Sequence, residues 1–216
     1  MSKVKVAAFT ISLDGFGAGP AQSLKNPMGL GTENLHSWMA TSKMFYKMLG
    51  KDGGREGVDN EIANNSMENN GAWIMGRNMF GPIRGPWPND EWKGWWGPNP
   101  PYHVPVFVLT HYARAPIEME GGTTFHFITG GIDAALEEAK KVANGKDIRI
   151  GGGTSTVRQF LQAGYIDEMQ LTLSPMLLGA GENLFTGMDF AALGFNEVEH
   201  KMGEEAMHVI LKKRIS

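Results

Sequence analysis

A run of glycines followed by hydroxyl residues has the clearest chemical potential in this sequence. Its members are Gly151, Gly152, Gly153, Thr154, Ser155 and Thr156. The glycines remove side chains where the backbone would approach a ligand closely. The hydroxyl residues stand at an expected helix N-terminus, where unpaired N–H groups and a partial positive charge can bind phosphate. Because the run matches neither G-x-G-x-x-G nor the P-loop, two interpretations stay open: a nucleotide phosphate site, or a tight turn that binds nothing.

Two further apolar stretches end in residues suited to an anion. Residues 72–75 run into Gly76 and Arg77, and residues 106–110 run into His111. Arginine offers a planar, permanently charged fork that suits phosphate. Ligands collect at the carboxyl ends of strands in open α/β sheets. Three such ends on one chain therefore favour a cofactor site over three unrelated turns with solvated side chains.

Asp14 is a carboxylate at the end of the first expected strand, residues 5–13. In that position it can orient a substrate or relay a proton. It can equally shape a turn, because Gly15 follows it and Asp-Gly is a strong turn pair. The two roles are compatible, and Asp14 is the candidate catalytic residue.

Apolar periodicity predicts strands that alternate with helices over most of the chain. Strands are expected at residues 5–13, 72–75, 106–110, 124–128 and 168–173, and directly before the glycine run. Helices are expected at residues 33–49, 58–70, 133–143 and 157–163, a long loop at 16–32, and a closing antiparallel hairpin at 195–201 and 206–214. The order predicts a single α/β domain over residues 1–216, with a central mixed, mostly parallel sheet and flanking helices.

The composition argues against several classes of function. A formal net charge of −3 disfavours a nucleic-acid partner, which would need a basic face. The chain has no cysteine, so disulfides and cysteine-ligated zinc are impossible, and its six histidines show no metal-ligand spacing. No apolar segment is long enough to cross a membrane. We therefore expect a cytoplasmic protein with no metal, no nucleic acid and no membrane partner.

Residues 82–105 are unusually rich in tryptophan and proline. The tryptophans are Trp87, Trp92, Trp95 and Trp96. They can roof a substrate pocket or bury a dimer face, or they can form a loop packed on its own core. The methionines between residues 39 and 75 can likewise fill the core or line an adaptable pocket.

Several motifs, taken together, match one superfamily. They are Ile11-Ser12-Leu13-Asp14-Gly15, Met75-Gly76-Arg77-Asn78-Met79-Phe80, residues 106–110, Gly151-Gly152-Gly153 with Gln159-Phe160-Leu161, and Leu178-Gly179 with Gly181-Glu182 and Leu184-Phe185. On these motifs the sequence resembles the dihydrofolate-reductase-like superfamily over nearly the whole chain. Within it, the chain is most similar to stand-alone relatives of the reductase domain of the riboflavin-biosynthesis deaminase–reductase.

The resemblance implies an NADPH-dependent reductase that transfers a hydride to a small heterocycle of the pterin, pyrimidine or riboflavin-precursor type. It implies that Arg77 and Asn78 meet the cofactor's phosphates, with Arg77 at the 2′-phosphate, and that Thr110 and His111 flank the adenosine. The expected cofactor set is Ala7, Ala8, Gly76, Arg77, Asn78, Thr110, His111, Gly151, Gly152, Gly153, Thr154, Ser155 and Thr156. The resemblance also implies a homodimer.

The sequence departs from dihydrofolate reductase itself, which carries an acidic residue on the helix after its mobile loop. Here residues 16–70 form a longer insertion, in which Glu33, Asp59 and Glu61 are the candidate carboxylates. This departure keeps a second function open, that of a non-catalytic protein that binds or senses NADPH or another nucleotide on the same fold.

Overall fold

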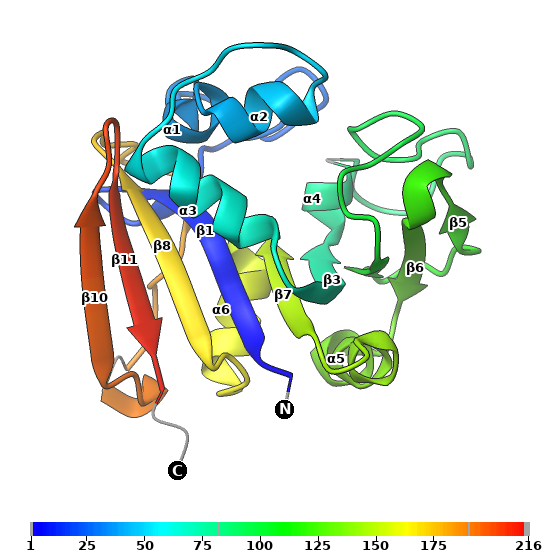
Figure 1. Cartoon of the computed structure of the whole chain (residues 1–216). Helices are drawn as coiled ribbons and strands as arrows, with labels where there is room; N and C mark the ends of the chain where they lie inside the picture. The colour runs from blue at the N-terminus through cyan, green and yellow to red at the C-terminus, as the bar shows by residue number, and fades with distance from the viewer. Residues whose placement is uncertain (1, 82, 190, 214–216) are drawn as a thin grey trace.

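The computed structural model describes residues 2–81, 83–189 and 191–213, and it arranges them around one large sheet (Figure 1). Nine strands lie in the order β10-β11-β8-β1-β7-β3-β4-β6-β5. Their bounds are β1 Val4–Ser12, β3 Asn70–Gly76, β4 Pro105–Leu109, β5 Ile117–Glu118, β6 Thr124–Ile128, β7 Asp147–Gly152, β8 Glu168–Ser174, β10 Glu197–Met202 and β11 Met207–Lys212. The strands from β8 to β6 run parallel, and the edge strands pair antiparallel. The expected mixed, mostly parallel sheet and its C-terminal hairpin are confirmed.

Short helices and loops connect the strands. The helices are α1 Ser37–Ala40, α2 Lys43–Met48, α3 Val58–Met67, α4 Arg77–Phe80, α5 Gly131–Val142 and α6 Thr154–Gln162, with 3-10 turns at Glu120–Gly122 and Ala191–Leu193. A separate strand pair, β2 Phe16–Ala18 and β9 Glu182–Asn183, lies outside the main sheet. None of the described helices combines the length and the apolar character that crossing a membrane requires.

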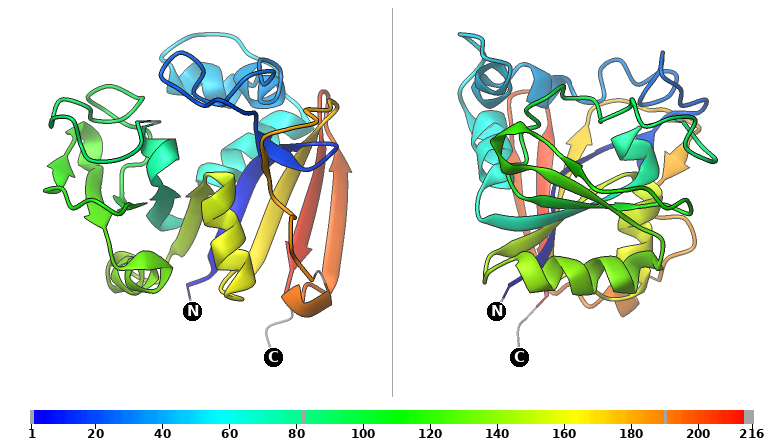
Figure 2. Two further views of the ribbon diagram at one scale, coloured as in Figure 1. Left: turned by 180° about the vertical axis from the view of Figure 1, so that it is seen from behind. Right: turned by 90° about the vertical axis from the view of Figure 1, so that its right-hand side faces the viewer.

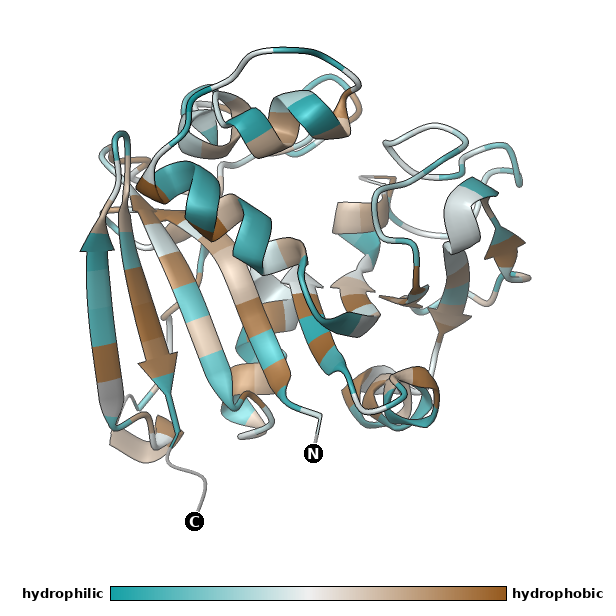
Figure 3. Cartoon of the chain, in the orientation of Figure 1, coloured by the Kyte–Doolittle hydropathy of each residue, from teal (hydrophilic) through white to brown (hydrophobic). Residues whose placement is uncertain are grey.

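One face of the sheet packs against α5 and α6. Ile148 and Ile150 of β7 belong to this core and are completely buried. From α6, Val157, Phe160 and Leu161 join them at helical spacing. Figure 2 shows α6 lying across this face, and Figure 3 shows hydrophobic and hydrophilic residues alternating along the strands.

Two separate apolar clusters cover the opposite face. The first joins α3 to α1, through Ile62, Ala63 and Trp38. The second joins β3, β4 and β6 to the tryptophan-rich loop, in which Trp87 and Trp92 pack against the sheet. In Figure 1, α3 crosses in front of β1, while the tryptophan-rich loop lies on the side of β4 and β6.

The strand order brings the predicted site residues to one edge of the sheet. β1, β7, β3 and β4 are consecutive neighbours. The chain passes through β1, β3, β4 and β6 before it returns to place β7 between β1 and β3. The order in which the strands are added to the sheet therefore changes direction between β1 and β3. Open α/β sheets bind ligands at the carboxyl ends of the strands beside such a switch point.

β1 is irregular beside β7. The two strands pair from Val4 with Ile148 to Val6 with Ile150, and the register of β1 with β8 shifts between Val6 and Phe9. Within the shifted stretch Ala8 has a φ of 53°, in a region that side chains other than glycine rarely adopt. The ladder between β1 and β7 therefore stops short of the carboxyl edge in the described pairs.

The prediction of a single helix over residues 33–49 is wrong. α1 ends at Ala40 and α2 begins at Lys43. Ser42 breaks the run, because its backbone is extended with ψ of 149° and its hydroxyl accepts a hydrogen bond from the Phe45 amide. Serine in this position caps a helix by satisfying a free N–H group, so the sequence starts a second helix there.

Other boundaries differ by a few residues from those expected. The loop at 16–32 contains β2, which pairs with β9. α3 ends at Met67 because Asn70 already belongs to β3, and α6 begins at Thr154 directly after the glycines. Residues 1, 82, 190 and 214–216, which include the first residue of the tryptophan-rich segment and the end of the predicted hairpin, lie outside the described residues.

A buried hydrogen-bond chain fixes α3 to the sheet. His208 of β11 is completely buried, with Nε2 2.7 Å from Asp59 Oδ1 and Nδ1 3.0 Å from Thr172 Oγ1. The other oxygen of Asp59 accepts a 2.8 Å hydrogen bond from the Glu205 amide. Asp59 thus connects α3 with both β11 and the hairpin turn before it.

We predict that Asp59→Ala lowers the free energy of unfolding by about 2–4 kcal/mol, because a buried imidazole and a backbone amide both lose their partner. Urea denaturation followed by circular dichroism measures the change. Glu61→Ala, an exposed change on the same helix, is the control and should cost about 0.5 kcal/mol or less. A loss below about 1 kcal/mol for Asp59→Ala would contradict this role.

Candidate functional site

A cavity of about 1050 Å³ opens at the carboxyl edge of the central strands. Every residue of the expected cofactor set lines it, from Ala7 and Ala8 on β1 to Thr156 on α6. Ligand pockets commonly measure about 300–1,000 Å³. The cavity is therefore large enough for a cofactor and a small second molecule together.

The glycine run forms one wall of this cavity without side chains. A Cβ built on Gly151 would lie 3.0 Å from Trp73, and Gly152 has a φ of +125°, so neither position readily accepts another residue. Gly153 differs, because no heavy atom lies within 4 Å of the place its Cβ would take. The peptide bond between Gly152 and Gly153 is cis. The backbone thus meets open space at Gly153, directly before α6.

α6 begins at this wall and packs closely on β3. A Cβ on Gly76 would stand 2.3 Å from the hydroxyl oxygen of Thr156, so only glycine permits this approach. Thr154 and Thr156 are buried, while Ser155 is exposed. The first residues of this nine-residue helix line the cavity, and no side chain caps the free N–H groups of its first turn.

Arg77 follows β3 and carries a charge that no described carboxylate neutralises. Its Nη1 donates to the Gly85 carbonyl at 3.3 Å and to Thr110 Oγ1 at 3.4 Å. Its Nε and Nη2 are buried with no hydrogen-bond partner. Burial, and then the like charge of Arg114, lower the pKa of Arg77. The group is thus a partly desolvated cation that lacks an anion.

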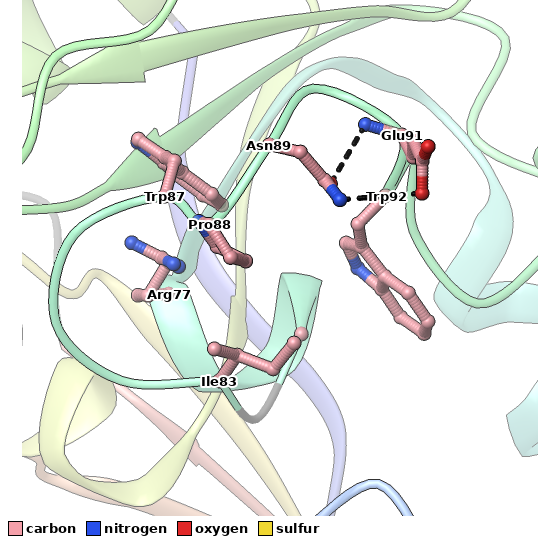
Figure 4. A pocket seen from close by; sticks show the side chains of 8 residues that line it. Arg77, Ile83, Trp87, Pro88, Asn89, Glu91 and Trp92 are labelled. Carbon is pink, nitrogen blue, oxygen red and sulfur yellow. Dashed lines mark hydrogen bonds between the residues drawn. The ribbon is translucent and has the colours of Figure 1, made fainter.

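Trp87 holds the guanidinium of Arg77 in place. The Cζ atom of Arg77 lies 3.1 Å from the centroid of the Trp87 ring, and Figure 4 shows the two side chains together at a second pocket of about 280 Å³. Arg114 approaches the same ring at 4.8 Å but is paired with Asp90, at 3.3 Å between Nε and Oδ1. Of the two cations at Trp87, Arg114 has a counter-ion and Arg77 has none among the described residues.

The far end of the cavity is apolar, and its tryptophans and methionines include residues for which the sequence leaves a pocket-lining role open. Short helices α1 and α2 and the loop before β4 supply its walls. The apolar residues there are Met39, Met44, Met48, Phe45, Trp95 and Trp96. The tryptophan-rich segment thus has two roles: Trp95 and Trp96 line the cavity, while Trp87 and Trp92 pack on the core and line the second pocket.

Three polar residues at this end of the cavity are not among the site residues expected from the sequence: Arg149, Tyr102 and His36. Arg149 stands between two buried isoleucines in β7 and is itself buried; a charged residue inside an apolar strand is the signal that marks it. Burial raises the pKa of Tyr102 to about 12 and lowers that of His36 to about 4. Both groups are therefore uncharged near neutral pH.

Asp14 does not line the cavity. Its Oδ1 accepts hydrogen bonds from Ser12 at 2.5 Å and from the Leu178 amide at 3.1 Å, and its Oδ2 accepts one from the Gly179 amide at 2.7 Å. The hydrogen bond from Ser12, ahead of those from the two amides, lowers the pKa of Asp14 against the opposing effect of burial. These contacts give Asp14 the turn-forming role, and its catalytic role stays a prediction.

The three candidate carboxylates of the insertion have different positions. Glu33 lines the cavity from the loop before α1. Asp59 is bound to His208 and Glu61 is exposed, and neither lines the cavity. Within the described ranges, His, Asp and Glu side chains nowhere gather in threes as a metal site.

Solved structures share this architecture. A protein from Shewanella sp. PV-4 assigned to riboflavin biosynthesis superposes with a TM-score of 0.61 at 22% identity, and the match covers 100% of each chain. RibD of Acinetobacter baumannii gives 0.54 at 16% identity, over 100% of this chain and 59% of that one. The Thermotoga maritima diaminohydroxyphosphoribosylaminopyrimidine deaminase/5-amino-6-(5-phosphoribosylamino)uracil reductase gives 0.52 at 14%, over 99% and 56%. The chain thus spans little more than half of the last two proteins, and the likeness establishes the dihydrofolate-reductase-like fold.

Sequence comparisons reach the same group of proteins. YyaP of Bacillus subtilis (strain 168), described as uncharacterized, is 42% identical over 55 residues, which are 24% of this chain and 29% of YyaP. The sequence model of the RibD C-terminal domain matches residues 4–209. The resemblance seen in the motifs is therefore confirmed, and the chain belongs to the RibD C-terminal domain family.

Proposed function

We propose that this chain is an NADPH-dependent reductase that transfers a hydride to a small heterocycle of the pterin, pyrimidine or riboflavin-precursor type. The observation that carries the proposal is Arg77, whose Nε and Nη2 are buried without partners at the cavity wall. An uncompensated buried cation is costly, and a phosphate monoester supplies both the charge and the acceptors it lacks. Family membership supports the same class of reaction.

The other cavity residues fit the remaining parts of NADPH. The start of α6 offers backbone N–H groups to a pyrophosphate, beside open space at Gly153. Ala7 and Ala8 place small side chains on the cavity wall formed by β1, where a flat ring can approach closely. Thr110 and His111 line the wall beside Arg77 and would flank the adenosine.

NADPH supplies a hydride when it is bound. The residues of the chain align the acceptor, exclude water and provide or relay one proton. Tyr102 and His36 line the cavity in uncharged forms that can carry a proton. Asp14 supports the site indirectly in this proposal, because it ties the turn after β1 to residues 178 and 179.

A non-catalytic protein that binds or senses NADPH is the alternative. The observation that favours it is that α3 contributes Ser66 and Met67 to the cavity but no carboxylate. The expected homodimer and cytoplasmic location stay predictions, which light scattering and cell fractionation test.

Calorimetric titration of the purified protein with NADPH and NADH tests the proposal. We expect saturable binding that prefers NADPH, followed by NADPH oxidation with at least one compound among pterins, pyrimidines and flavin precursors. Failure to bind either cofactor would overturn the proposal. Selective binding without oxidation across the whole panel would favour the sensing alternative.

We predict that Arg77→Met weakens NADPH binding about 10- to 100-fold, since a charge-assisted contact to phosphate is lost. NADH, which lacks the 2′-phosphate, should lose about threefold or less. Lys140→Gln removes an exposed positive charge from α5 and should leave both affinities unchanged. Equal losses for the two cofactors would remove Arg77 from the 2′-phosphate site.

Gly153→Val tests whether the cofactor crosses the glycine wall. With φ −74° and ψ −167°, Gly153 has a backbone that valine adopts without strain. Its side chain would then occupy the open space of the cavity, so NADPH affinity should fall about tenfold or more while Tm moves by about 2 °C or less. Gly153→Ala should give a smaller loss, and undiminished affinity in the valine variant would place the cofactor elsewhere.

Asp14→Ala separates a structural from a catalytic role. Because the folded protein lowers the pKa of Asp14 below 3.8, its stabilisation is present above that pH and disappears as pH falls through the lowered value. The Tm difference between wild type and variant should therefore shrink from neutral pH to strongly acidic pH in differential scanning fluorimetry. A large fall in kcat with an unchanged Tm would instead assign proton transfer to Asp14.

A further inference from the structure

We propose that the end of the cavity beyond the cofactor residues binds a flat, largely apolar carbonyl compound whose oxygen faces Arg149, and that it rejects phosphoribosyl compounds. This inference rests on the proposed function, because it names the substrate class of the same cavity. It departs from the phosphoribosylated substrate in the name of the Thermotoga maritima relative.

Arg149 is the first observation behind this inference. Its side chain projects from β7 to the face opposite α5 and α6 and lines the cavity, although the residue is only 6% exposed. It donates to the carbonyls of Ser66 and of Ala7, the latter at 2.8 Å, and contacts the Met67 sulfur at 3.4 Å. It forms no ion pair with any described carboxylate.

One nitrogen of this guanidinium has no partner. Nε of Arg149 is buried and has no hydrogen-bond partner. Burial accordingly lowers the pKa of Arg149 to about 9. An unpaired buried N–H group on a cation is unfavourable, and a single ligand oxygen is sufficient to satisfy it.

The surroundings of Arg149 are aromatic. Its Cζ lies 4.1 Å from the centroid of the Trp73 ring, and the Trp73 and Tyr102 rings meet edge to face at 4.9 Å. All three residues line the cavity. The surface formed by Arg149, Trp73 and Tyr102 suits a planar ligand, because aromatic rings and a guanidinium both stack well on flat π-systems.

The cavity walls beside this aromatic surface are apolar, and their side chains are flexible. Met39, Met44 and Met48 line the cavity from α1 and α2, opposite the tryptophan-rich loop. Phe45 meets Trp96 edge to face at 6.3 Å, so the two segments touch at this point. Methionine side chains adjust to ligands of different outline, which favours an apolar molecule of some size.

The charges at this end disfavour a phosphate. The cavity-lining arginines are Arg77, Arg84 and Arg149. Arg84 directly precedes Gly85, whose carbonyl accepts a hydrogen bond from Arg77, so the backbone of Arg84 lies beside Arg77 at the cofactor end. Arg149 already gives its Nη atoms to protein acceptors, and Glu33 adds negative charge near α1. A phosphate dianion would be desolvated there with little compensation.

The test compares three probes by calorimetry, with and without NADP⁺: menadione (a flat apolar diketone), methylnaphthalene (the same outline without oxygen) and uridine monophosphate (a phosphoribosyl pyrimidine). Menadione should bind about tenfold or more tightly than either of the others, because it alone combines apolar area with an acceptor. Preferential binding of uridine monophosphate in the presence of saturating NADP⁺, which occupies the Arg77 end under the proposed function, would overturn the inference. Equal binding of menadione and methylnaphthalene would also overturn it.

Variants locate the contact. Arg149→Met should remove the advantage of menadione over methylnaphthalene, and persistence of that advantage in the folded variant would refute the role of Arg149. Met48→Glu places a carboxylate on the apolar wall and should weaken menadione about tenfold, and it serves where Arg149→Met does not fold. Leu49→Glu adds the same carboxylate at an exposed apolar position directly after α2 and outside the cavity, and it is the matched control. An unchanged menadione affinity in Met48→Glu would also refute the inference.

The cofactor titration separates the two proposals. Failure to bind NADPH, with the probe preference intact, would overturn the reductase function and support the apolar site. NADPH binding with preference for uridine monophosphate would overturn the apolar site and leave the reductase function standing.

Discussion

The site depends on the way in which β1 and β7 stop pairing before they reach the carboxyl edge of the sheet. Their ladder ends at Val6 and Ile150, and beyond it the side chain of Arg149 donates to the carbonyl of Ala7. A backbone carbonyl left without a ladder partner inside a sheet would otherwise be unsatisfied. The guanidinium replaces the missing hydrogen bond, reaches the end of α3 at Ser66, and so permits a cavity between two neighbouring parallel strands.

The gap between β1 and β7 also determines how the adjacent elements are arranged. Because β1 and β7 do not pair beyond Val6 and Ile150, the glycines after Ile150 are free to turn into α6, and Gly76 lets Thr156 approach β3. The large core under α5 and α6 supports the arrangement from the other face. The cavity therefore opens on the face that two smaller apolar clusters cover. On the opposite face the core is one continuous cluster, which closes the cavity on that side.

Much of the fold was predictable, because its signals are local. Apolar runs that end in glycine, arginine or threonine mark the ends of β7, β3 and β4, and the family resemblance indicates the fold. The role of Arg149 was not predictable, since it depends on Ala7 and Ser66, which are distant in sequence. The division of the helix at 33–49 could have been read from Ser42, whose capping role competes with helix periodicity. The Asp14-Gly15 pair predicts a turn, but the partners of Asp14 at residues 178 and 179 are distant in sequence and appear only in the three-dimensional structure.

The break between α1 and α2 has a consequence for how this protein can diverge. The two helices have four and six residues and lie outside the sheet ladder, yet they supply much of the apolar wall. Substitutions there change the shape offered to a ligand without disturbing strand pairing or the glycine wall. Under the proposed function, selection can therefore alter substrate range through this segment at small cost to folding, while the sheet edge and glycine wall proposed for the cofactor stay unchanged.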